Sequence, residues 1–283
     1  MDYFVSIENT MYYHWQISLL IKSFESIKDK LCIAITDTQP KISLPPILEK
    51  HKRKFFHNDY GKERYYEKFN TIISLMGALD EGVISTPFTL IHPDMVLVSP
   101  VEEFEEDIVF SLEISKETDE LKGRLKSVID TIRNYLQIPE DTLPWLPLGD
   151  VITFNKVPDN FFHRVLENME TLFKQTEKEM ILYGSQWNIY KAALIITIYE
   201  FLPKLKLKHG IKEGYLINSD LNFNFLHYKH GLPSVFHKRY FTYNSTLSMA
   251  STGPYQTLLD NRSTQAVDYM CKIIENIKKE IRT

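Results

Sequence analysis

The sequence predicts an α/β fold with a mostly parallel central sheet, flanked by helices and followed by a C-terminal helical elaboration. Two observations support this prediction. In the first half of the chain, short runs of β-forming residues alternate with segments of helical periodicity. The strand runs are almost continuously apolar, which is typical of parallel strands covered by helices on both faces.

The first half contains four strand predictions and two helix predictions. Residues 3–7 and 31–37 are rich in β-formers, and residues 14–28 between them have apolar residues near helical spacing. Strand, helix and strand in this order predict a βα unit with a parallel partner strand. The segment 60–82 predicts a long helix that ends at Gly82. The two further strand predictions cover 88–98 and 107–114.

The second half contains more helix. A loop bracketed by prolines leads into a strand within 143–155, and the segment 214–233 predicts one or two more strands. Helices are predicted over 159–178, 185–202 and 259–281. No internal repeat, low-complexity tract or flexible linker interrupts the chain, so we expect a single domain over residues 1–283.

Composition makes several classes of protein less favoured, although a local basic groove for DNA can coexist with an acidic total charge. Of the 283 residues, 43% are hydrophobic and 25% are charged, as in ordinary globular domains, and the net charge of −4 gives no global basic field for nucleic acid or acidic membranes. Two cysteines are too few for a disulfide framework or a cysteine-based zinc site. The first residues do not resemble a signal peptide, and no window is apolar enough to span a bilayer. We therefore expect a cytoplasmic protein with no membrane partner.

The segment "FTLIHPDMVLVSP" places His92, Pro93 and Asp94 between two apolar runs. On an extended chain, residues i and i+2 point to the same side, so His92 and Asp94 could share one target. A divalent cation whose other ligands are phosphate oxygens would suit them. The alternative is a surface turn, and the apolar flanks favour the site.

Polar residues also follow the first two predicted strands. Ser6 and Glu8 end the first strand, and Asp37 ends the second. Ligands of open α/β sheets bind at the carboxyl ends of the strands, so these residues are candidates for contacts with a nucleotide. For Asp37 the alternative is a turn or a helix cap.

An ordered series of short segments resembles a known family of enzymes. The series consists of "YYHWQISLLIKSF", "YEKFNTIISLM", the H-P-D motif, "PLGDVITFN", "SQWNIYKAAL" and "FLHYKHGLPSVFHK". It resembles the hydroxyproline O-arabinosyltransferases and peptidyl serine galactosyltransferases, and it covers roughly residues 3 to 245. The resemblance implies a GT-A-like glycosyltransferase fold. Residues 1–115 would form the half that binds the nucleotide-sugar, and residues 116–283 would form the acceptor side and the C-terminal helix.

The resemblance also implies a metal site. GT-A enzymes hold Mn²⁺ or Mg²⁺ on a short acidic motif, and Asp94 is the matching residue. His92 stands where the family has an acidic or another polar residue, and His227 matches a C-terminal histidine ligand, with His230 and His237 as nearby competitors. Lys68, in the helix before the motif, would reach the diphosphate, or would face solvent.

On the acceptor side, the resemblance points to three residues. Gly149 permits a close approach of the backbone, and Asp150 would hydrogen-bond the sugar or act as a base. Trp187 would contact the sugar or the acceptor. The structural alternatives are an ordinary loop aspartate and a buried tryptophan.

The expected reaction moves a sugar, by best guess arabinose, from a UDP-sugar to a hydroxyl. Since the chain shows no anchor, the acceptor expected first is 5-hydroxymethylcytosine in double-stranded phage DNA. The stretches 49–66 and 204–210 interleave basic and aromatic residues. They could form a rim that contacts DNA phosphates, or they could be ordinary charged segments exposed to solvent. Two alternatives stay open: a glycosyltransferase that acts on a protein or glycan hydroxyl, and a non-catalytic protein that binds sugar nucleotides. The sequence does not indicate the oligomeric state.

Overall fold

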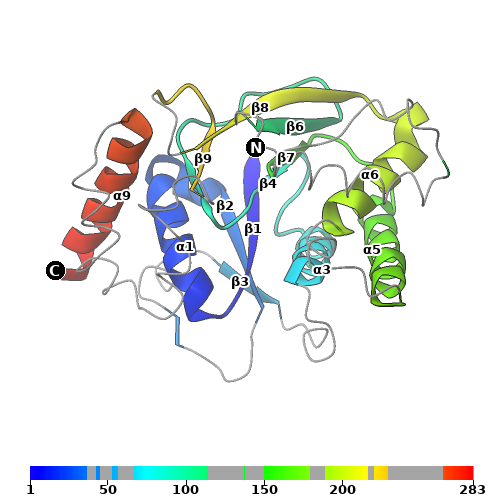
Figure 1. Ribbon diagram of the computed structural model, residues 1–283, viewed down its shortest axis with the longest axis horizontal. Coiled ribbons are helices and arrows are strands. Elements are labelled where there is room, and N and C mark those ends of the chain that lie inside the picture. The colour runs from blue at the N-terminus through cyan, green and yellow to red at the C-terminus, as the bar shows by residue number, and fades with distance from the viewer. Residues whose placement is uncertain are drawn as a thin grey trace.

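In the computed structural model, the described residues form a nine-stranded mixed sheet in the order β3-β2-β1-β4-β7-β6-β8-β9-β5 (Figure 1). The structure describes residues 1–36, 43–44, 53–56, 67–113, 137, 150–178, 189–215, 220–228 and 264–282. The strands are β1 (Asp2–Glu8), β2 (Leu31–Thr36), β3 (Arg53–Phe56), β4 (Phe88–Leu90), β5 (Met95–Leu97), β6 (Ile108–Glu113), β7 (Ile152–Phe154), β8 (Leu207–Tyr215) and β9 (Phe225–His227).

Most of the strand pairs are parallel, as the sequence predicts. β3, β2, β1 and β4 form one parallel group, and β6, β8 and β9 form a second. β7 lies antiparallel between the two groups, and β5 pairs antiparallel with β9 at the edge. The prediction of an α/β fold with a mostly parallel central sheet is confirmed.

Helices cover both faces of the sheet. α1 (Met11–Ser23) and α9 (Gln265–Arg282) lie on one side, and α3 (Glu67–Asp80), α5 (Phe161–Lys178) and α6 (Ile189–Phe201) lie on the other (Figure 1). Two 3₁₀ helices, η1 (Glu25–Lys30) and η4 (Leu202–Lys204), lead into β2 and β8. Successive side chains of β1 point to opposite faces of the sheet and so contribute to the core on each face. Phe4 packs in the core with α3, α5 and α6, whereas Val5 and Ile7 pack in the core under α1.

The helix sequences fit these positions. α5 buries one stripe, formed by Phe161, Val165, Met169 and Leu172, as an amphipathic surface helix does. α6 is apolar around most of its circumference and is buried accordingly. Among the described residues, no helix is both long and apolar enough to cross a bilayer.

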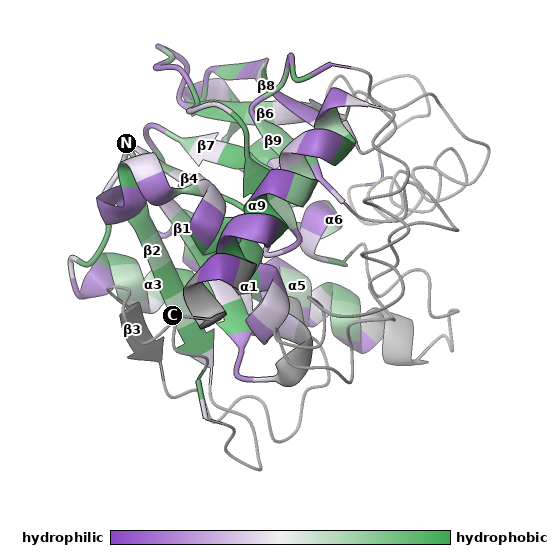
Figure 2. Ribbon diagram, turned by 90° about the vertical axis from the view of Figure 1, so that its left-hand side faces the viewer, coloured by the Kyte–Doolittle hydropathy of each residue, from purple (hydrophilic) through white to green (hydrophobic). Residues whose placement is uncertain are grey.

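The C-terminal helix α9 packs on α1, and Figure 2 shows its mixed polar and apolar surface from outside. Its buried stripe includes Val267, Met270 and Ile274. The Tyr269 hydroxyl donates a hydrogen bond to the carbonyl of Leu97, so α9 braces the edge strand β5. This helix confirms the predicted C-terminal elaboration within the described residues.

The predicted strand over 88–98 is wrong as a single element. The structure divides it into β4 and β5, with a turn at Pro93 and Asp94. Pro93 has no backbone N–H to donate to a strand ladder, so the strand breaks there. β4 pairs with β1, whereas β5 pairs with β9, far away in the sheet order. His92 and Asp94 therefore lie where the chain crosses from one part of the sheet to another.

Other elements also differ from the prediction. The helix predicted over 14–28 is α1, which ends at Ser23, followed by the separate 3₁₀ helix η1. The helix predicted over 60–82 begins at Glu67 within the described residues and ends at Asp80, with Gly82 following at φ +65°. The sequence analysis missed β3, whose residues "RKFF" lie in the basic stretch, because charged residues are common on edge strands and hide the strand pattern.

Candidate active site

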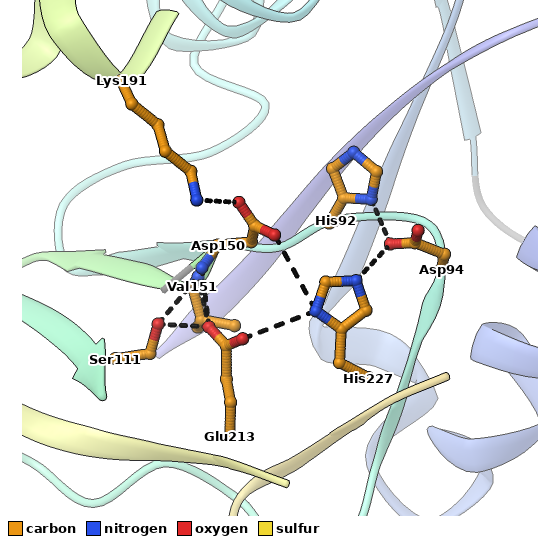
Figure 3. Close-up of polar contacts among 8 residues, drawn as sticks. All are labelled: His92, Asp94, Ser111, Asp150, Val151, Lys191, Glu213 and His227. Atoms are coloured by element: carbon orange, nitrogen blue, oxygen red, sulfur yellow. Dashed lines mark hydrogen bonds and ion pairs between the residues drawn. The ribbon is translucent and has the colours of Figure 1, made fainter. Parts of the chain in front are cut away.

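The turn between β4 and β5 carries a buried carboxylate. Asp94 has no solvent-exposed surface, and its Oδ1 contacts Nδ1 of His92 in the same turn (Figure 3). His92 is half-buried at the end of β4. A carboxylate without exposed surface is costly unless charges or hydrogen bonds surround it. Asp94 therefore needs an interaction that offsets the free-energy cost of burying its carboxylate.

His227 joins this pair from β9, the strand that pairs with β5. It is the last residue of β9 and lies opposite Met95 in the β5–β9 register, so its ring reaches the residue that precedes Met95. Its Nε2 lies 3.1 Å from Oδ1 of Asp94. One ligand atom each from His92, Asp94 and His227 lies within 4.8 Å of the others. The structure thus brings together the three residues predicted as metal ligands.

Asp150 faces the same cluster from the segment before β7. It precedes β7, and its Oδ2 lies 3.8 Å from Nδ1 of His227 (Figure 3). Its Oδ1 forms an ion pair of 2.8 Å with Nζ of Lys191, on the first turn of α6. Lys191 was not predicted. It belongs to the segment "SQWNIYKAAL" and is a charged residue at the start of a mostly apolar helix, a signal that could have identified it.

Glu213 is a second residue that the sequence analysis missed. It is buried in β8, and its Oε2 lies 3.6 Å from Nδ1 of His227. Its Oε1 accepts hydrogen bonds from the backbone N–H groups of Asp150, at 2.7 Å, and Val151, at 3.0 Å, and from the hydroxyl of Ser111. The available signal was the strand period, because Glu213 occupies the same face of β8 as the buried Ile211 and Tyr215.

Two tyrosines flank the cluster. The ring of Tyr215 stacks on His227 with a centroid distance of 5.8 Å and an interplanar angle of 17°. Burial, together with the negative charge of Asp150, raises the pKa of Tyr190 above its ordinary value. The hydroxyl of Tyr190 therefore keeps its proton beside Asp150.

Ser6 and Glu8 lie toward the carboxyl end of β1, on the face that also carries Phe4. Glu8 accepts a hydrogen bond of 3.1 Å from Nδ2 of Asn70 on α3. β1 and β4 are parallel, so this end of β1 and the His92 end of β4 lie at the same edge of the sheet.

The remaining predicted residues lie outside the described part of the chain. These are Asp37, Gly149, Trp187, His230 and His237. Lys68 lies in the first turn of α3, but its side chain is also outside the described part.

Comparisons with known proteins show structural similarities of low sequence identity. No protein-family model matches the chain, and no curated protein matches it. The structure is similar to that of the WbbM bifunctional glycosyltransferase, with a TM-score of 0.49, 12% identity, and coverage of 96% of this chain and 51% of that one. It is also similar to the galactosyltransferase LgtC in complex with donor and acceptor sugar analogues, with a TM-score of 0.48, 10% identity, and coverage of 98% of this chain and 96% of that one. The chain spans about half the length of WbbM. An assignment of function therefore depends on the geometry of the site.

Proposed function

We propose that the protein is a metal-dependent glycosyltransferase that moves a sugar from a UDP-sugar to an acceptor hydroxyl. The observation that carries this proposal is the buried cluster of His92, Asp94 and His227, with Asp150 on its far side. A site for sugar transfer needs positive charge beside the leaving diphosphate and a polar group beside the attacking hydroxyl. The cluster offers candidates for both.

The charges of the cluster support a bound cation. Asp94, Asp150 and Glu213 would bring three negative charges, and Lys191 brings one positive charge. Protonated histidines or a divalent cation would offset the difference, and buried charge is stable only when it is offset. Two imidazole nitrogens and a carboxylate oxygen suit a first-row divalent metal such as Mn²⁺ better than Mg²⁺, which prefers oxygen ligands.

Each side chain has a defined task in this proposal. Asp94, His92 and His227 hold the cation, which when bound offsets the negative charge that develops on the departing diphosphate. Asp150 either hydrogen-bonds the sugar or accepts the proton of the attacking hydroxyl, and Lys191 pairs with its carboxylate and orients it. Trp187 and Gly149 would complete the acceptor side.

The donor nucleotide would lie along the carboxyl ends of β1 and β2. Ser6 and Glu8 support this placement, because they reach the sheet edge that His92 also reaches. Asp37 and Lys68 would complete the donor site, with Lys68 directed at the diphosphate.

For the donor sugar we propose arabinose, and for the acceptor we propose 5-hydroxymethylcytosine in double-stranded phage DNA. The resemblance to arabinosyltransferases supports the sugar. Lys204, Lys206 and Lys208 are exposed at the start of β8 and support a contact with phosphate, although Lys208 also lies 3.3 Å from the carboxylate of Glu106. A base inside a duplex would have to be flipped or reached from a groove.

Mass spectrometry tests this proposal. Hydroxymethylcytosine DNA is incubated with the protein, Mn²⁺ and a panel of UDP-sugars, and a mass gain of one pentose with UDP-arabinose is expected. The control reaction contains the Asp94→Ala variant. No mass gain with any donor removes the DNA acceptor, and a gain on peptide or glycan acceptors instead favours the second enzymatic alternative. Binding of UDP-sugar without transfer to any acceptor, or to water, would favour a non-catalytic binding protein.

A further inference from the structure

Tyr228 directly follows the candidate ligand His227 and is fully buried. Its backbone N–H donates a hydrogen bond of 3.4 Å to the carbonyl of Asp94, and its hydroxyl donates one of 3.5 Å to the carbonyl of Pro93. Both carbonyls belong to the turn between β4 and β5. A single residue therefore connects the end of β9 with the turn that carries Asp94.

This turn depends on its carbonyl groups for a fixed position. The chain leaves β4, which pairs with β1, and enters β5, which pairs with β9, so one strand ladder does not run through the turn. Pro93 has no N–H, and its carbonyl is the only backbone group by which a neighbour can hold it through a hydrogen bond. The hydroxyl of Tyr228 binds this group.

The packing around Tyr228 directs its hydroxyl at the turn. The ring lies against Trp15 of α1, with a centroid distance of 5.7 Å and an interplanar angle of 43°. Both residues belong to a hydrophobic cluster that also contains Val96 of β5, Leu226 of β9 and the apolar stripe of α9. A buried hydroxyl is stable when it meets an acceptor, and here it meets the carbonyl of Pro93.

The position of the turn decides whether the three candidate ligands lie together. His92 and Asp94 lie on either side of Pro93, and His227 approaches from β9, so that the three side chains face one another (Figure 3). If a binding site is assembled in only a fraction of the molecules, the apparent affinity falls by that fraction. A group that keeps the turn in place therefore strengthens metal binding without being a ligand.

We infer that Tyr228 is a positioning residue of the candidate metal site, and that its hydroxyl holds the turn at Pro93 so that His92 and Asp94 stay beside His227 before an ion binds. This inference depends on the proposed function for the identity of the ion. The position of the turn can be measured without an ion.

The substitution Tyr228→Phe tests the inference, because it removes the hydroxyl and keeps the packed ring. Binding of Mn²⁺, followed by electron paramagnetic resonance of the free ion, is the first measurement, at a temperature at which the variant is folded. We expect Tyr228→Phe to bind Mn²⁺ about 3- to 10-fold more weakly, which corresponds to the net free energy of one hydrogen bond.

The matched control is Tyr269→Phe. It removes a hydroxyl that donates to the carbonyl of Leu97 in β5, the strand that follows the turn, and Tyr269 packs against the same hydrophobic cluster as Tyr228. Both variants should have a lower melting temperature, but Tyr269→Phe should bind Mn²⁺ as the wild type does. An equal loss of affinity in the two variants would mean that Tyr228 acts only through the stability of the cluster, and would overturn the inference.

Hydrogen exchange in the metal-free protein, measured by NMR, is the second measurement. The amide of residue 228 reports whether it stays bonded to the carbonyl of Asp94. Tyr228→Phe should speed the exchange of this amide more than it speeds exchange in α5, which lies on the other face of the sheet (Figure 1). Tyr269→Phe should not produce this local difference.

The outcomes separate this inference from the proposed function. If the wild type does not bind Mn²⁺, the proposed metal site fails, and the exchange of the residue 228 amide alone decides the role of Tyr228. If the wild type binds Mn²⁺ and Tyr228→Phe binds it equally, the inference is overturned. If Tyr228→Phe does not fold, the wild-type exchange decides, because an amide of residue 228 that exchanges as fast as an exposed amide would contradict a turn held in place.

Discussion

Oδ1 of Asp94 lies 3.1 Å from Nε2 of His227, because β5 pairs antiparallel with β9 and sets Met95 opposite His227. The two residues lie far apart in the chain, and this strand pairing is what brings them together. Asp94 lies in the turn before β5, and His227 is the last residue of β9. The pairing of these two strands therefore fixes the backbone positions of both residues. A site built on strand ends in this way is already organised before a ligand binds.

Replacement of Asp94 should abolish metal binding without unfolding the protein. Asp94→Asn keeps the shape of the side chain but removes its charge. We expect Mn²⁺ affinity to fall by at least about 100-fold, because the loss of a metal ligand should weaken binding at least as much as the loss of a residue that only orients a ligand. Asp94→Ala should also stay folded, because it removes a costly buried carboxylate. Mn²⁺ titration and thermal unfolding without metal check both expectations.

The control for Asp94 is Asp80→Asn, which removes an exposed carboxylate at the end of α3. It should change neither Mn²⁺ affinity nor the melting temperature. If Asp94→Asn binds Mn²⁺ as tightly as Asp80→Asn does, Asp94 is not a ligand.

The effects of replacing Lys191 and Asp150 on kcat/KM should be coupled, because the two side chains form an ion pair. Asp150→Asn is expected to lower kcat/KM by about 10²- to 10⁴-fold if Asp150 acts as the base. Lys191→Met removes the partner and should lower kcat/KM by about tenfold, the rate effect of about 1.4 kcal/mol. Because Lys191 acts through Asp150, the double variant should be no worse than Asp150→Asn.

Steady-state kinetics of the two single variants and the double variant measures this coupling. Lys174→Met, which removes an exposed lysine of α5, is the matched control and should keep wild-type kinetics. Losses that multiply in the double variant would show that Lys191 acts independently of Asp150.

The fold class could be predicted from sequence because it depends on local patterns. Apolar strand runs and helical periodicity set the order of the elements, and most of the observed elements follow it. Strand pairing beyond the first βα unit could not be predicted, because it depends on contacts between distant segments. The division of 88–98 into β4 and β5 shows this limit. Pro93 indicates where the strand breaks, but nothing in the sequence near Pro93 indicates that β5 pairs with β9.

The candidate site shows the same division. Asp94, His92 and His227 could be predicted because a motif between apolar flanks and a resemblance pointed to them. Glu213 could not be predicted in the same way, because a single glutamate in a strand resembles an exposed residue until its face of the sheet is known. Lys191 stands out as a charged residue in an apolar segment, but its contact with Asp150 could not be predicted, because that contact depends on how α6 packs near β7.

Gly214, next to Glu213, should tolerate no side chain. A Cβ at this position would lie 2.2 Å from Cδ1 of Phe223, whose ring is buried. Gly214→Ala should therefore lower the free energy of unfolding by about 1 to 3 kcal/mol, the usual cost of overpacking. Urea denaturation measures the loss.

A second substitution shows whether this clash is the cause. Phe223→Leu shortens the side chain that the new Cβ would meet. In the Phe223→Leu background, Gly214→Ala should cost less than in the wild type. Equal costs in both backgrounds would mean that Phe223 is not the obstacle.

His14 should make the stability of the protein sensitive to acid. It is buried on α1, its Nε2 donates a hydrogen bond of 2.7 Å to Oδ1 of Asn9, and burial lowers its pKa from the ordinary value of 6.5. Below pH 6.5 the unfolded chain binds a proton that the folded protein resists. The contribution of His14 is thus fully present above that pH and is lost as the pH falls through the lowered pKa.

His14→Gln keeps a donor toward Asn9 but cannot titrate. Its urea midpoint should therefore change less than that of the wild type between about pH 7 and about pH 5. Some acid sensitivity should remain, because burial also lowers the pKa of His209. Parallel urea curves at several pH values test this, and a slope equal to that of the wild type would mean that His14 is protonated as easily in the folded protein as in the unfolded chain.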